Sequence, residues 1–444
     1  MSRKPNILFF FTDDQRFDTI HALNCPEIQT PNLDRLVESG TTFTNGYIMG
    51  GTSGAVCMPS RAMLMTGRTL FHIQEQGQDI AQEHTMLGEH LRASGYHTHG
   101  IGKWHNGPSS YTRSFTSGNR IFFGGMSDHW AVPLSPFDPE GTYPNDRIFH
   151  EDKVHSSDLF SGAAVEFIEN YREDRPFFAY VAFTAPHDPR DTHPKFHELY
   201  RMNLPSVPEN LLPEHPFDNG ALQIRDEKLA PWPRTPGVIR THLADYYAMI
   251  SHADSCIGRV IDALKASGQY ENTIVVFAGD NGLALGRHGL MGKQNLYDHS
   301  VHVPLVFSGP GIPKGERRDA YAYLLDIFPT LCDLTGLHTP DSVEGMSLVP
   351  VLQDAGASVR DVMHFAYTHY QRAVQDDRWK LIEYHVEGKR TTQLFDRQVD
   401  PLEMKNLADD PSCAGHLACL RKELKTWKDD LGDPAEGFYE APFD

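Results

Sequence analysis

Short runs of consecutive apolar residues alternate with longer amphipathic segments along most of the chain. Uninterrupted apolar runs are typical of strands buried on both faces, because such strands have no side that faces water. Between these runs, apolar residues recur at the spacing of a helix with one buried face. We expect strands at 7–12, 96–102, 177–184, 273–279 and 303–307, and helices at 31–39, 85–94, 157–172 and 241–267.

The first predicted helix shows clear local signals for its face and its two ends. Leu33, Leu36 and Val37 share one face. Thr30 precedes the helix at a position suited to an N-cap, and Gly40 follows as a residue that ends helices. Strands and helices that alternate in this way are typical of parallel sheets covered by helices. We therefore predict an α/β fold in which a large mixed, mainly parallel sheet is sandwiched by helices.

The pattern changes after Gly345, where short alternating runs replace the long buried ones. This change predicts a small α+β subdomain made of an antiparallel sheet and a helix. We place a large domain at 1–340 and the subdomain at 341–444. The runs lie at 364–367, 372–374, 379–384 and 393–396, and the helix is expected at 413–430.

Charge and cysteine content narrow the classes of partner. The chain has 59 acidic and 40 basic residues, a net charge of −19, which opposes binding to nucleic acid or to anionic membranes. An anionic substrate would therefore need a local basic pocket.

The six cysteines are scattered without a CxxC pair, which argues against a disulfide framework or a zinc site. The first apolar run, 7–11, is too short for a signal peptide or a membrane span, so we expect a cytoplasmic protein.

Acidic residues follow two of the predicted strands. Asp13 and Asp14 come after the first strand, and Asp280 and Asn281 come after the fourth. Such residues often cap turns, but two pairs at the same edge of a parallel sheet would repel one another unless a cation lay between them. Carboxylate and amide oxygens are the ligands that Ca²⁺ and Mg²⁺ prefer. The two pairs together favour a hard divalent metal.

Cationic side chains and histidines follow other strand ends. Lys103 and His105 come after the second strand, His187 after the third, and Lys293 lies in a glycine-rich loop after Asp280. Each alone reads as an ordinary structural or surface residue. Together they would surround the carboxylates with positive charge, which suits a tetrahedral oxyanion held against a metal.

Cys57 lies just before a short predicted helix that has Pro59 in its first turn and Gly67 at its end. A thiolate at the positive end of a helix dipole would be reactive. A thiolate is also a soft ligand, poorly matched to a metal site made of oxygen atoms. This mismatch indicates that Cys57 does not act as a cysteine.

The stretch CMPSRAMLMTGR around Cys57 resembles the signature of the sulfatase family, C-x-P-S-R-x-x-x-x-T-G-R. In that family the cysteine is oxidised after translation to Cα-formylglycine. The motifs TDDQ, GKWH, APH, GDNG and GKQNLYD resemble further parts of the family pattern in the same order. The resemblance implies a fold similar to alkaline phosphatase, with a large α/β domain and a small C-terminal domain.

The resemblance also implies a metal site and a modified nucleophile. One Ca²⁺, or Mg²⁺ in its place, would be held by Asp13, Asp14, Asp280, Asn281 and modified Cys57. The aldehyde would hydrate to a gem-diol, and the metal would lower the pKa of the hydroxyl that attacks sulfur. A formylglycine-generating enzyme would be needed during maturation.

Five further residues receive roles by the same resemblance. Arg61 would hold the diol, and Lys103 and Lys293 would grip the sulfate oxygens. His187, which also lies against the substrate, would protonate the leaving alcohol, assisted by Lys293. His105 would remove the remaining hydroxyl proton, which expels sulfate and restores the aldehyde.

The segment 106–133 resembles that of bacterial sulfatases that act on 2-O-sulfated uronic acids of glycosaminoglycan-type oligosaccharides. A uronate carboxylate needs a second cationic contact, and an arginine fork fits it. Arg190, Arg113 and Arg120 are candidates, although each also reads as a surface or salt-bridging residue. The proline-rich segment 194–236 is expected to be a surface excursion beside the substrate.

A few more residues could line a sugar site. His369, Tyr370 and Arg372 lie where the subdomain could overhang the pocket. Trp104 and Trp130 could stack on a sugar, although packing in the core is the ordinary role of a tryptophan.

Two other functions stay open. Phosphonate monoester and phosphodiester hydrolases share this fold and signature, and their substrates carry the same single charge as a sulfate ester. A protein that binds sulfated sugar without catalysis would be expected to have lost its nucleophile or metal ligands, whereas every such position is filled here.

Overall fold

The computed structural model describes residues 4–440, and for Glu75 the backbone only. An eight-stranded sheet has the strand order β5-β4-β6-β1-β7-β8-β2-β9. Neighbouring strands run parallel except at the β7–β8 and β8–β2 pairs, so the predicted mixed, mainly parallel sheet is confirmed. The strands are β1 (Asn6–Thr12), β2 (Gly40–Tyr47), β4 (His97–Lys103), β5 (Ser117–Phe122), β6 (Phe177–Ala182), β7 (Thr273–Gly279), β8 (Leu305–Ser308) and β9 (Glu316–Tyr323).

The strands β2, β5 and β9 were not expected from the sequence. β5 and β9 lie at the two edges of the sheet and are only partly buried, and β2 is rich in threonine and glycine. None of the three therefore has the continuous apolar run that marks a central strand.

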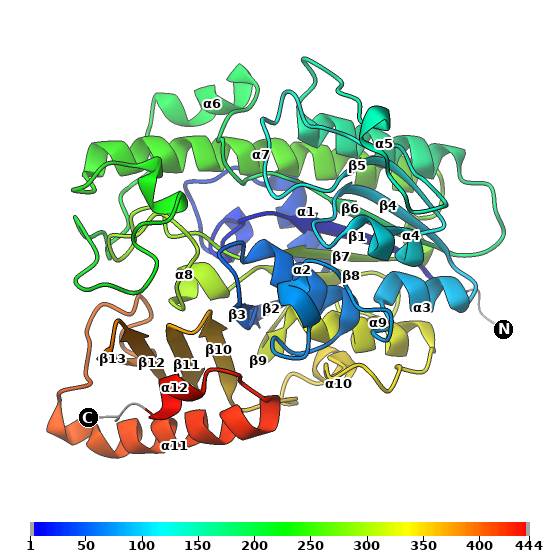
Figure 1. Cartoon of the computed structure of the whole chain (residues 1–444). Coiled ribbons are helices and arrows are strands. Elements are labelled where there is room, and N and C mark those ends of the chain that lie inside the picture. Colours follow the sequence, from blue (N-terminus) through cyan, green and yellow to red (C-terminus); the bar gives the residue numbers. More distant parts are fainter. Residues whose placement is uncertain (1–3, 441–444) are drawn as a thin grey trace.

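Helices cover both faces of the large sheet (Figure 1). Leu8 and Phe10 of β1 point to the core beneath α1 (Pro31–Ser39), α5 (Ser156–Asn170) and α7 (Pro236–Ala266). Phe9 and Phe11 point to the opposite core, beneath α2 (Cys57–Thr66), α3 (Leu87–Ala93) and α9 (Ile327–Thr335). This alternation confirms the sandwich of helices that the sequence predicts. The remaining helices in this part are α4 (Pro108–Ser114), α6 (Pro194–Arg201), α8 (Asp298–Val301) and α10 (Val349–Gln353).

The start of α1 differs from the prediction. Thr30 occupies the N-cap position, but its side chain accepts no capping hydrogen bond. Instead, Asp254 of α7 accepts the backbone N–H groups of Asn32 at 3.1 Å and Leu33 at 2.7 Å. A carboxylate distant in sequence thus satisfies the free amides of the helix.

We expect Asp254→Ala to lower the free energy of unfolding by about 2 kcal/mol, because it leaves buried amides without an acceptor. Urea denaturation of the two proteins measures the change. The control Asp262→Ala removes an exposed carboxylate of the same helix and should change stability by less than about 0.5 kcal/mol. Equal losses in the two variants would contradict the capping role.

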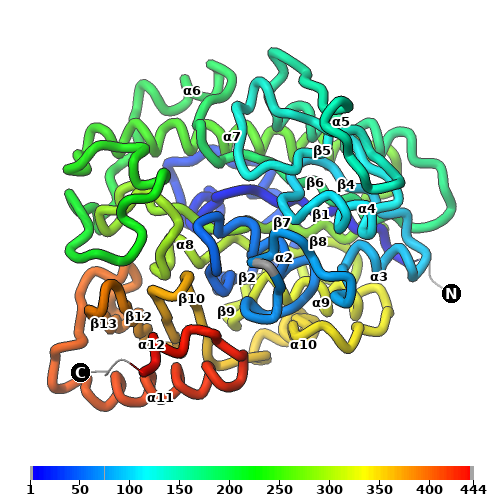
Figure 2. The backbone as a smooth tube through the Cα atoms, in the orientation of Figure 1, coloured from blue at the N-terminus to red at the C-terminus, as the bar shows by residue number. Residues whose placement is uncertain are grey.

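The excursion at 194–236 contains α6 and otherwise little regular structure, and α7 begins at Pro236 rather than near residue 241. A proline in the first helical turn explains this earlier start. Drawn in green, the segment after α6 runs down to the C-terminal strands (Figure 2). There the Gln371 side chain donates to the Asn219 carbonyl at 2.8 Å.

A second, five-stranded sheet forms the C-terminal part, in the order β13-β12-β11-β10-β3. Its antiparallel strands and its helix confirm the predicted α+β subdomain. The fifth strand, β3 (Gly50–Gly51), comes from the N-terminal part and pairs with β10 in parallel. The other elements are β10 (Met363–Tyr367), β11 (Gln371–Gln375), β12 (Trp379–Val386), β13 (Lys389–Asp396), α11 (Ala414–Leu431) and α12 (Glu436–Glu440).

The predicted domain limits of 1 and 444 lie outside the described residues, and the boundary at 340/341 stays a prediction. α10 follows that boundary but packs on α9 and β9.

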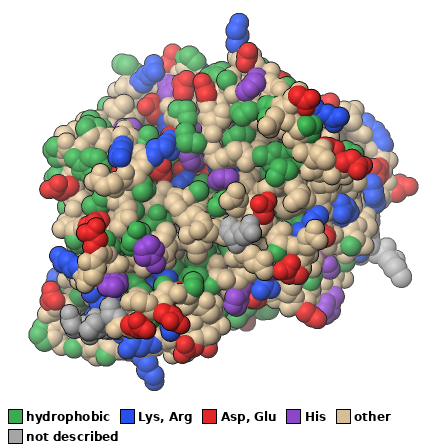
Figure 3. Space-filling view, in the orientation of Figure 1, with side chains coloured by type: hydrophobic (Ala, Val, Ile, Leu, Met, Phe, Trp, Pro, Cys, Tyr) green, Lys and Arg blue, Asp and Glu red, His purple; other side chains and the backbone are tan. Residues whose placement is uncertain are grey.

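Among residues 4–440, no helix combines the length and apolar character that crossing a membrane requires. Acidic side chains are spread over the face seen in Figure 3 and do not form one patch.

Candidate functional site

The predicted metal ligands lie side by side where two neighbouring central strands of the large sheet, β1 and β7, reach their carboxyl ends. β1 and β7 are paired in parallel up to their last residues, so the segments that follow them are neighbours. Asp13, Asp14, Asp280 and Asn281 are all buried. The backbone N–H of Asp14 donates to Asp280 Oδ1 at 2.9 Å, and Asn281 Nδ2 donates to Asp14 Oδ1 at 2.8 Å.

The N-terminal end of α2 is fixed to these strand ends. Cys57 is the first residue of the helix, and Gly67 ends it in the left-handed conformation with φ 64°. Ser60 Oγ donates to the Asp280 carbonyl at 2.6 Å. Arg61 contacts Asp280 Oδ2 through Nε at 3.0 Å and Nη2 at 2.8 Å. The helix therefore carries residue 57 to the carboxylates.

Two buried lysines complete the charged cluster. Lys103 Nζ contacts Asp13, and Lys293 Nζ contacts Asp14 and lies 3.1 Å from Cys57 Sγ. Burial alone would lower the pKa of Lys293, but the neighbouring acidic groups, Asp14 first among them, together outweigh burial and raise that pKa well above its usual range. Lys293 is thus positively charged beside residue 57.

Unmodified Cys57 would not be a reactive thiolate, contrary to the expectation from the helix dipole. Its side chain is buried, and burial raises the pKa of the thiol to about 12 despite the nearby Lys103 and Lys293. The neutral thiol is therefore the dominant form at pH 7.

The two histidines adjoin the same cluster. His187 Nε2 lies 3.7 Å from Asp14 Oδ2, while its Nδ1–H donates to the Asp188 carbonyl at 2.8 Å. Burial holds the pKa of His187 well below its usual range. His105 has a left-handed backbone with φ 72°, and its buried Nδ1 has no hydrogen-bond partner in the part of the chain that the structure describes. Burial and the Lys103 charge lower the pKa of His105, so that imidazole is neutral and can accept a proton.

His129 is a neighbour of the site that sequence reasoning missed. Its Nε2–H donates to the His187 carbonyl at 2.9 Å, and its Nδ1 accepts from Ser156 Oγ at 2.8 Å. It therefore fixes the backbone of the loop that carries His187. No motif marks such a residue, because its role depends on a contact with a carbonyl far along the chain.

The donor set fits a hard cation. Asp13 Oδ1 and Asn281 Oδ1 are buried, and within the described part of the chain neither has a hydrogen-bond partner. Burial and the neighbouring Asp13 carboxylate raise the pKa of Asp280 to about 7, a cost that a cation would remove. Ligand atoms of Asp13, Asp14, Cys57 and His187 lie within 4.8 Å of one another. Free oxygen atoms and crowded acids together meet the needs of Ca²⁺ or Mg²⁺.

The structure separates the three arginines considered for a substrate carboxylate. Arg113 pairs with Glu89 at 3.1 Å, and Arg120 pairs with Glu151 at 2.8 Å. Both arginines are therefore engaged in ion pairs within the protein rather than available to a substrate carboxylate. Arg190 has no carboxylate within 4 Å among the described residues, and its charge interacts through space with that of Asp14.

The residues considered for contact with a sugar differ in how far other side chains enclose them. Trp104 is buried among aromatic rings, and Arg372 is buried in an ion pair with Asp433. The core-packing role that is ordinary for a tryptophan is therefore confirmed for Trp104, whereas the prediction that Arg372 overhangs the pocket was wrong, because its side chain is buried in the ion pair. Trp130 donates through Nε1 to Asp191 at 2.9 Å. For the exposed His369 and its neighbour Tyr370, whose ring centroids are 3.9 Å apart, contact with a sugar stays a prediction.

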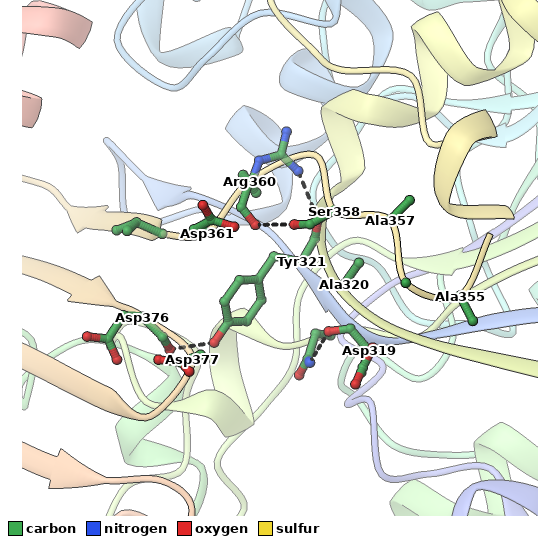
Figure 4. A pocket seen from close by; sticks show the side chains of 13 residues that line it. Asp319, Ala320, Tyr321, Ala355, Ala357, Ser358, Arg360, Asp361, Asp376 and Asp377 are labelled. Carbon is green, nitrogen blue, oxygen red and sulfur yellow. Dashed lines mark hydrogen bonds between the residues drawn. The ribbon is translucent and has the colours of Figure 1, made fainter. Parts of the chain in front are cut away.

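A separate hollow of about 680 Å³ is lined by residues of β9 and of the segments that flank β10 and β11 (Figure 4). Asp319, Asp361, Asp376 and Asp377 line it, while Arg360 is paired with Asp326. None of the predicted site residues borders this hollow.

Comparison with known proteins agrees with the motifs. The sulfatase family profile matches residues 5–337, and a profile for the N-sulphoglucosamine sulphohydrolase C-terminal region matches 286–430. The chain is 30% identical to a sulfatase of Formosa agariphila, with 96% of this chain and 88% of the relative covered. It is 26% identical to an N-acetylglucosamine-6-O-sulfatase of Bacteroides thetaiotaomicron, with 98% and 89% covered.

Solved structures share the fold. The structure of BT4656 with its substrate D-glucosamine-2-N,6-O-disulfate superposes with a TM-score of 0.82 at 23% identity, covering 97% of this chain and 99% of that one. BT1596, a 2-O glycosaminoglycan sulfatase, has a TM-score of 0.74 at 23% identity, covering 98% and 94%. A phosphonate monoester hydrolase of Agrobacterium radiobacter has a TM-score of 0.76 at 22% identity, covering 96% and 96%. One family profile matches three quarters of the sequence, and the signature cysteine lies beside the predicted metal ligands. The chain therefore belongs to the sulfatase family and is a sulfuric ester hydrolase.

Proposed function

We propose that this sulfatase releases inorganic sulfate from a sulfated carbohydrate, using formylglycine formed from Cys57 and one divalent cation. The observation that carries the proposal is the position of residue 57. It lies at the tip of α2, 3.1 Å from Lys293 Nζ, and its Sγ lies within 4.8 Å of ligand atoms of the buried Asp13, Asp14 and His187. Formation of the aldehyde would require a formylglycine-generating enzyme during maturation.

The cation would be held by Asp13, Asp14, Asp280, Asn281 and the converted residue 57. We propose Ca²⁺, with Mg²⁺ as a substitute, since all of these ligands would be oxygen atoms. When bound, the cation would supply Lewis-acid chemistry that makes the hydroxyl of residue 57 nucleophilic at neutral pH.

The charged side chains of the chain would bind and orient the ester. Lys103 and Lys293 would donate to sulfate oxygens, and their buried positions would strengthen these contacts. Arg61 would hold the hydroxyl groups of residue 57, since Asp280 already fixes its guanidinium. These contacts would balance the negative charge that shifts toward the leaving oxygen as the S–O bond breaks.

Two histidines would move protons. His187 would give a proton from Nε2 to the leaving alcohol, because its Nδ1–H is already donated to a carbonyl. Its pKa is low in the free site, so the negative charge of the bound ester would be needed to raise it. His105 is neutral and would accept the hydroxyl proton of residue 57 when sulfate leaves.

We expect His187→Gln to lower kcat about 10²-fold on a sulfated sugar, whose alkoxide needs a proton to leave. On 4-nitrophenyl sulfate the loss should be below about 10-fold, because a nitrophenolate leaves without protonation. Sulfate release measured on both substrates gives the comparison. Equal losses on the two would contradict the role of general acid.

For the sugar, we propose a 2-O-sulfated uronic acid of a glycosaminoglycan-type oligosaccharide. The resemblance of segment 106–133 to that of uronate 2-O-sulfatases supports this choice, and BT1596, a 2-O glycosaminoglycan sulfatase, shares the fold. A panel of defined sulfated disaccharides, with released sulfate as the readout, tests the proposal.

The likeness to a phosphonate monoester hydrolase supports a second candidate function on the same fold. Both substrate types carry one negative charge, so the lysines would bind either. Parallel assays on aryl sulfate and aryl phosphonate esters separate the two. A higher kcat/KM on the phosphonate would replace the first proposal by the second.

A further inference from the structure

The Arg190 side chain is poorly satisfied although it is largely enclosed. Its Nε and Nη2 are buried and have no hydrogen-bond partner among residues 4–440. Its Nη1 donates to His242 Nδ1 of α7 at 3.2 Å. The residue lies three positions after His187, in the loop that follows β6. Two donor atoms of this cation are therefore available to a partner from outside the described part of the chain.

Arg190 differs in this respect from the fully buried cations. Among the described residues, every lysine and arginine that is fully buried has a carboxylate within 4 Å, as buried charges generally require. A cation enclosed without such a partner is costly, and burial lowers the pKa of Arg190. The paired cations are Arg16, Arg61, Lys103, Arg234, Lys293, Arg318, Arg372 and Lys380.

His242 holds Arg190 without cancelling its charge. Burial and the positive charge of Arg190 lower the pKa of His242 to about 4, so the imidazole is neutral and its Nδ1 can accept the hydrogen bond. The nearby acids are engaged elsewhere. Asp245 contacts His197 at 3.1 Å, and Asp226 contacts Arg225 at 2.8 Å. The positive charge of Arg190 thus stays available to a ligand.

We propose that Arg190, positioned by His242, binds a second anionic group of the substrate, carried by the same sugar as the scissile sulfate. This inference rests on the proposed sulfatase function. His187, three residues before Arg190 in the same loop, lies 3.7 Å from Asp14 Oδ2, and the charge of Arg190 interacts with that of Asp14, so Arg190 lies near the site where Lys103 and Lys293 would hold that sulfate. A planar guanidinium fork fits a carboxylate or a second sulfate through two N–H groups. Substrates with two anionic groups would therefore be preferred over those with one.

The test compares substrates that differ in one charge. A 2-O-sulfated uronic acid disaccharide is compared with the same sugar after reduction of its carboxylate to an alcohol. A disulfated glucosamine is compared in the same way with its monosulfated form. We expect Arg190→Gln to lower kcat/KM about 10²-fold on one of the dianionic sugars, mainly through KM. On the matching monoanionic sugar and on 4-nitrophenyl sulfate, the loss should be below about 3-fold.

Two further variants serve as controls. Arg190→Lys keeps the charge but not the fork, so it should recover part of the loss. Arg240→Gln removes an arginine of α7 that donates to the carbonyl groups of Pro205 and Leu204, both at 2.9 Å, and should affect all substrates equally. Calorimetric titration of the dianionic sugar into Cys57→Ala and Cys57→Ala/Arg190→Gln measures binding without turnover, and the double variant should bind about 10²-fold more weakly.

The pair that shows the larger loss identifies the second group as a carboxylate or a sulfate. Equal losses on dianionic and monoanionic sugars, or unchanged binding in the titration, would overturn the inference while leaving the sulfatase function intact. An absence of sulfate release from every ester by the native enzyme would instead overturn the proposed function.

Discussion

Cys57→Ala is expected to abolish sulfate release, with a loss of about 10⁵-fold in kcat, because the side chain that would supply the nucleophile is removed. Released sulfate on a sulfated sugar and on 4-nitrophenyl sulfate measures the loss. Both substrates should be affected alike, since the attack on sulfur precedes any difference between leaving groups. In the native protein, mass spectrometry of the peptide containing Cys57 should show a lower mass, in accord with conversion of the CH₂SH group to an aldehyde.

Cys332→Ala provides the matched control, because Cys332 is also a free and fully buried cysteine, in α9. It should retain activity within about a factor of 3 while losing about 1–2 kcal/mol of stability through the small cavity that it creates. A native enzyme that is active with an entirely unmodified thiol would contradict the role of formylglycine. Comparable activity losses in the two variants would also contradict it.

Removal of the divalent cation by a chelator is expected to lower both activity and stability. Activity should fall at least about 10³-fold, since the hydroxyl of residue 57 would lose its Lewis acid. At an ion concentration about 100-fold above Kd, binding adds about 2.7 kcal/mol of stability, which the chelator removes. Thermal unfolding with and without chelator measures this term independently of activity. Adding back Ca²⁺ or Mg²⁺ separately shows which ion restores both properties.

Asp13→Asn sharpens this test, because Asp13 Oδ1 is a buried acceptor without a hydrogen-bond partner. The variant should weaken metal binding and shrink the chelator-sensitive part of its stability. Asp319→Asn is the control, since Asp319 lies in the separate acidic hollow of Figure 4. A chelator effect on stability that is the same in Asp13→Asn as in the native protein would contradict the assigned ligand set.

The sequence alone determined five strands of the large sheet, the signature around Cys57 and the grouping of the carboxylates. The grouping could be predicted because parallel strands end at a common edge, so Asp13 and Asp280 meet although they lie far apart along the chain. The edge strands could not be found in this way. Their half-exposed positions break the apolar runs that identify buried strands.

Only the tertiary structure decided which charged residues are free and which are paired. Arg113, Arg120 and Arg190 look alike in the sequence, but two of them meet a glutamate and the third does not. The partners of Arg113 and Arg120 lie on other elements, and the local sequence around an arginine does not predict such long-range contacts. The capping of α1 by Asp254 and the buried, neutral state of the Cys57 thiol likewise depend on contacts between segments that are distant in the sequence. The physical reason is that burial and long-range pairing set the energy of a charge, and both arise only when distant segments pack together.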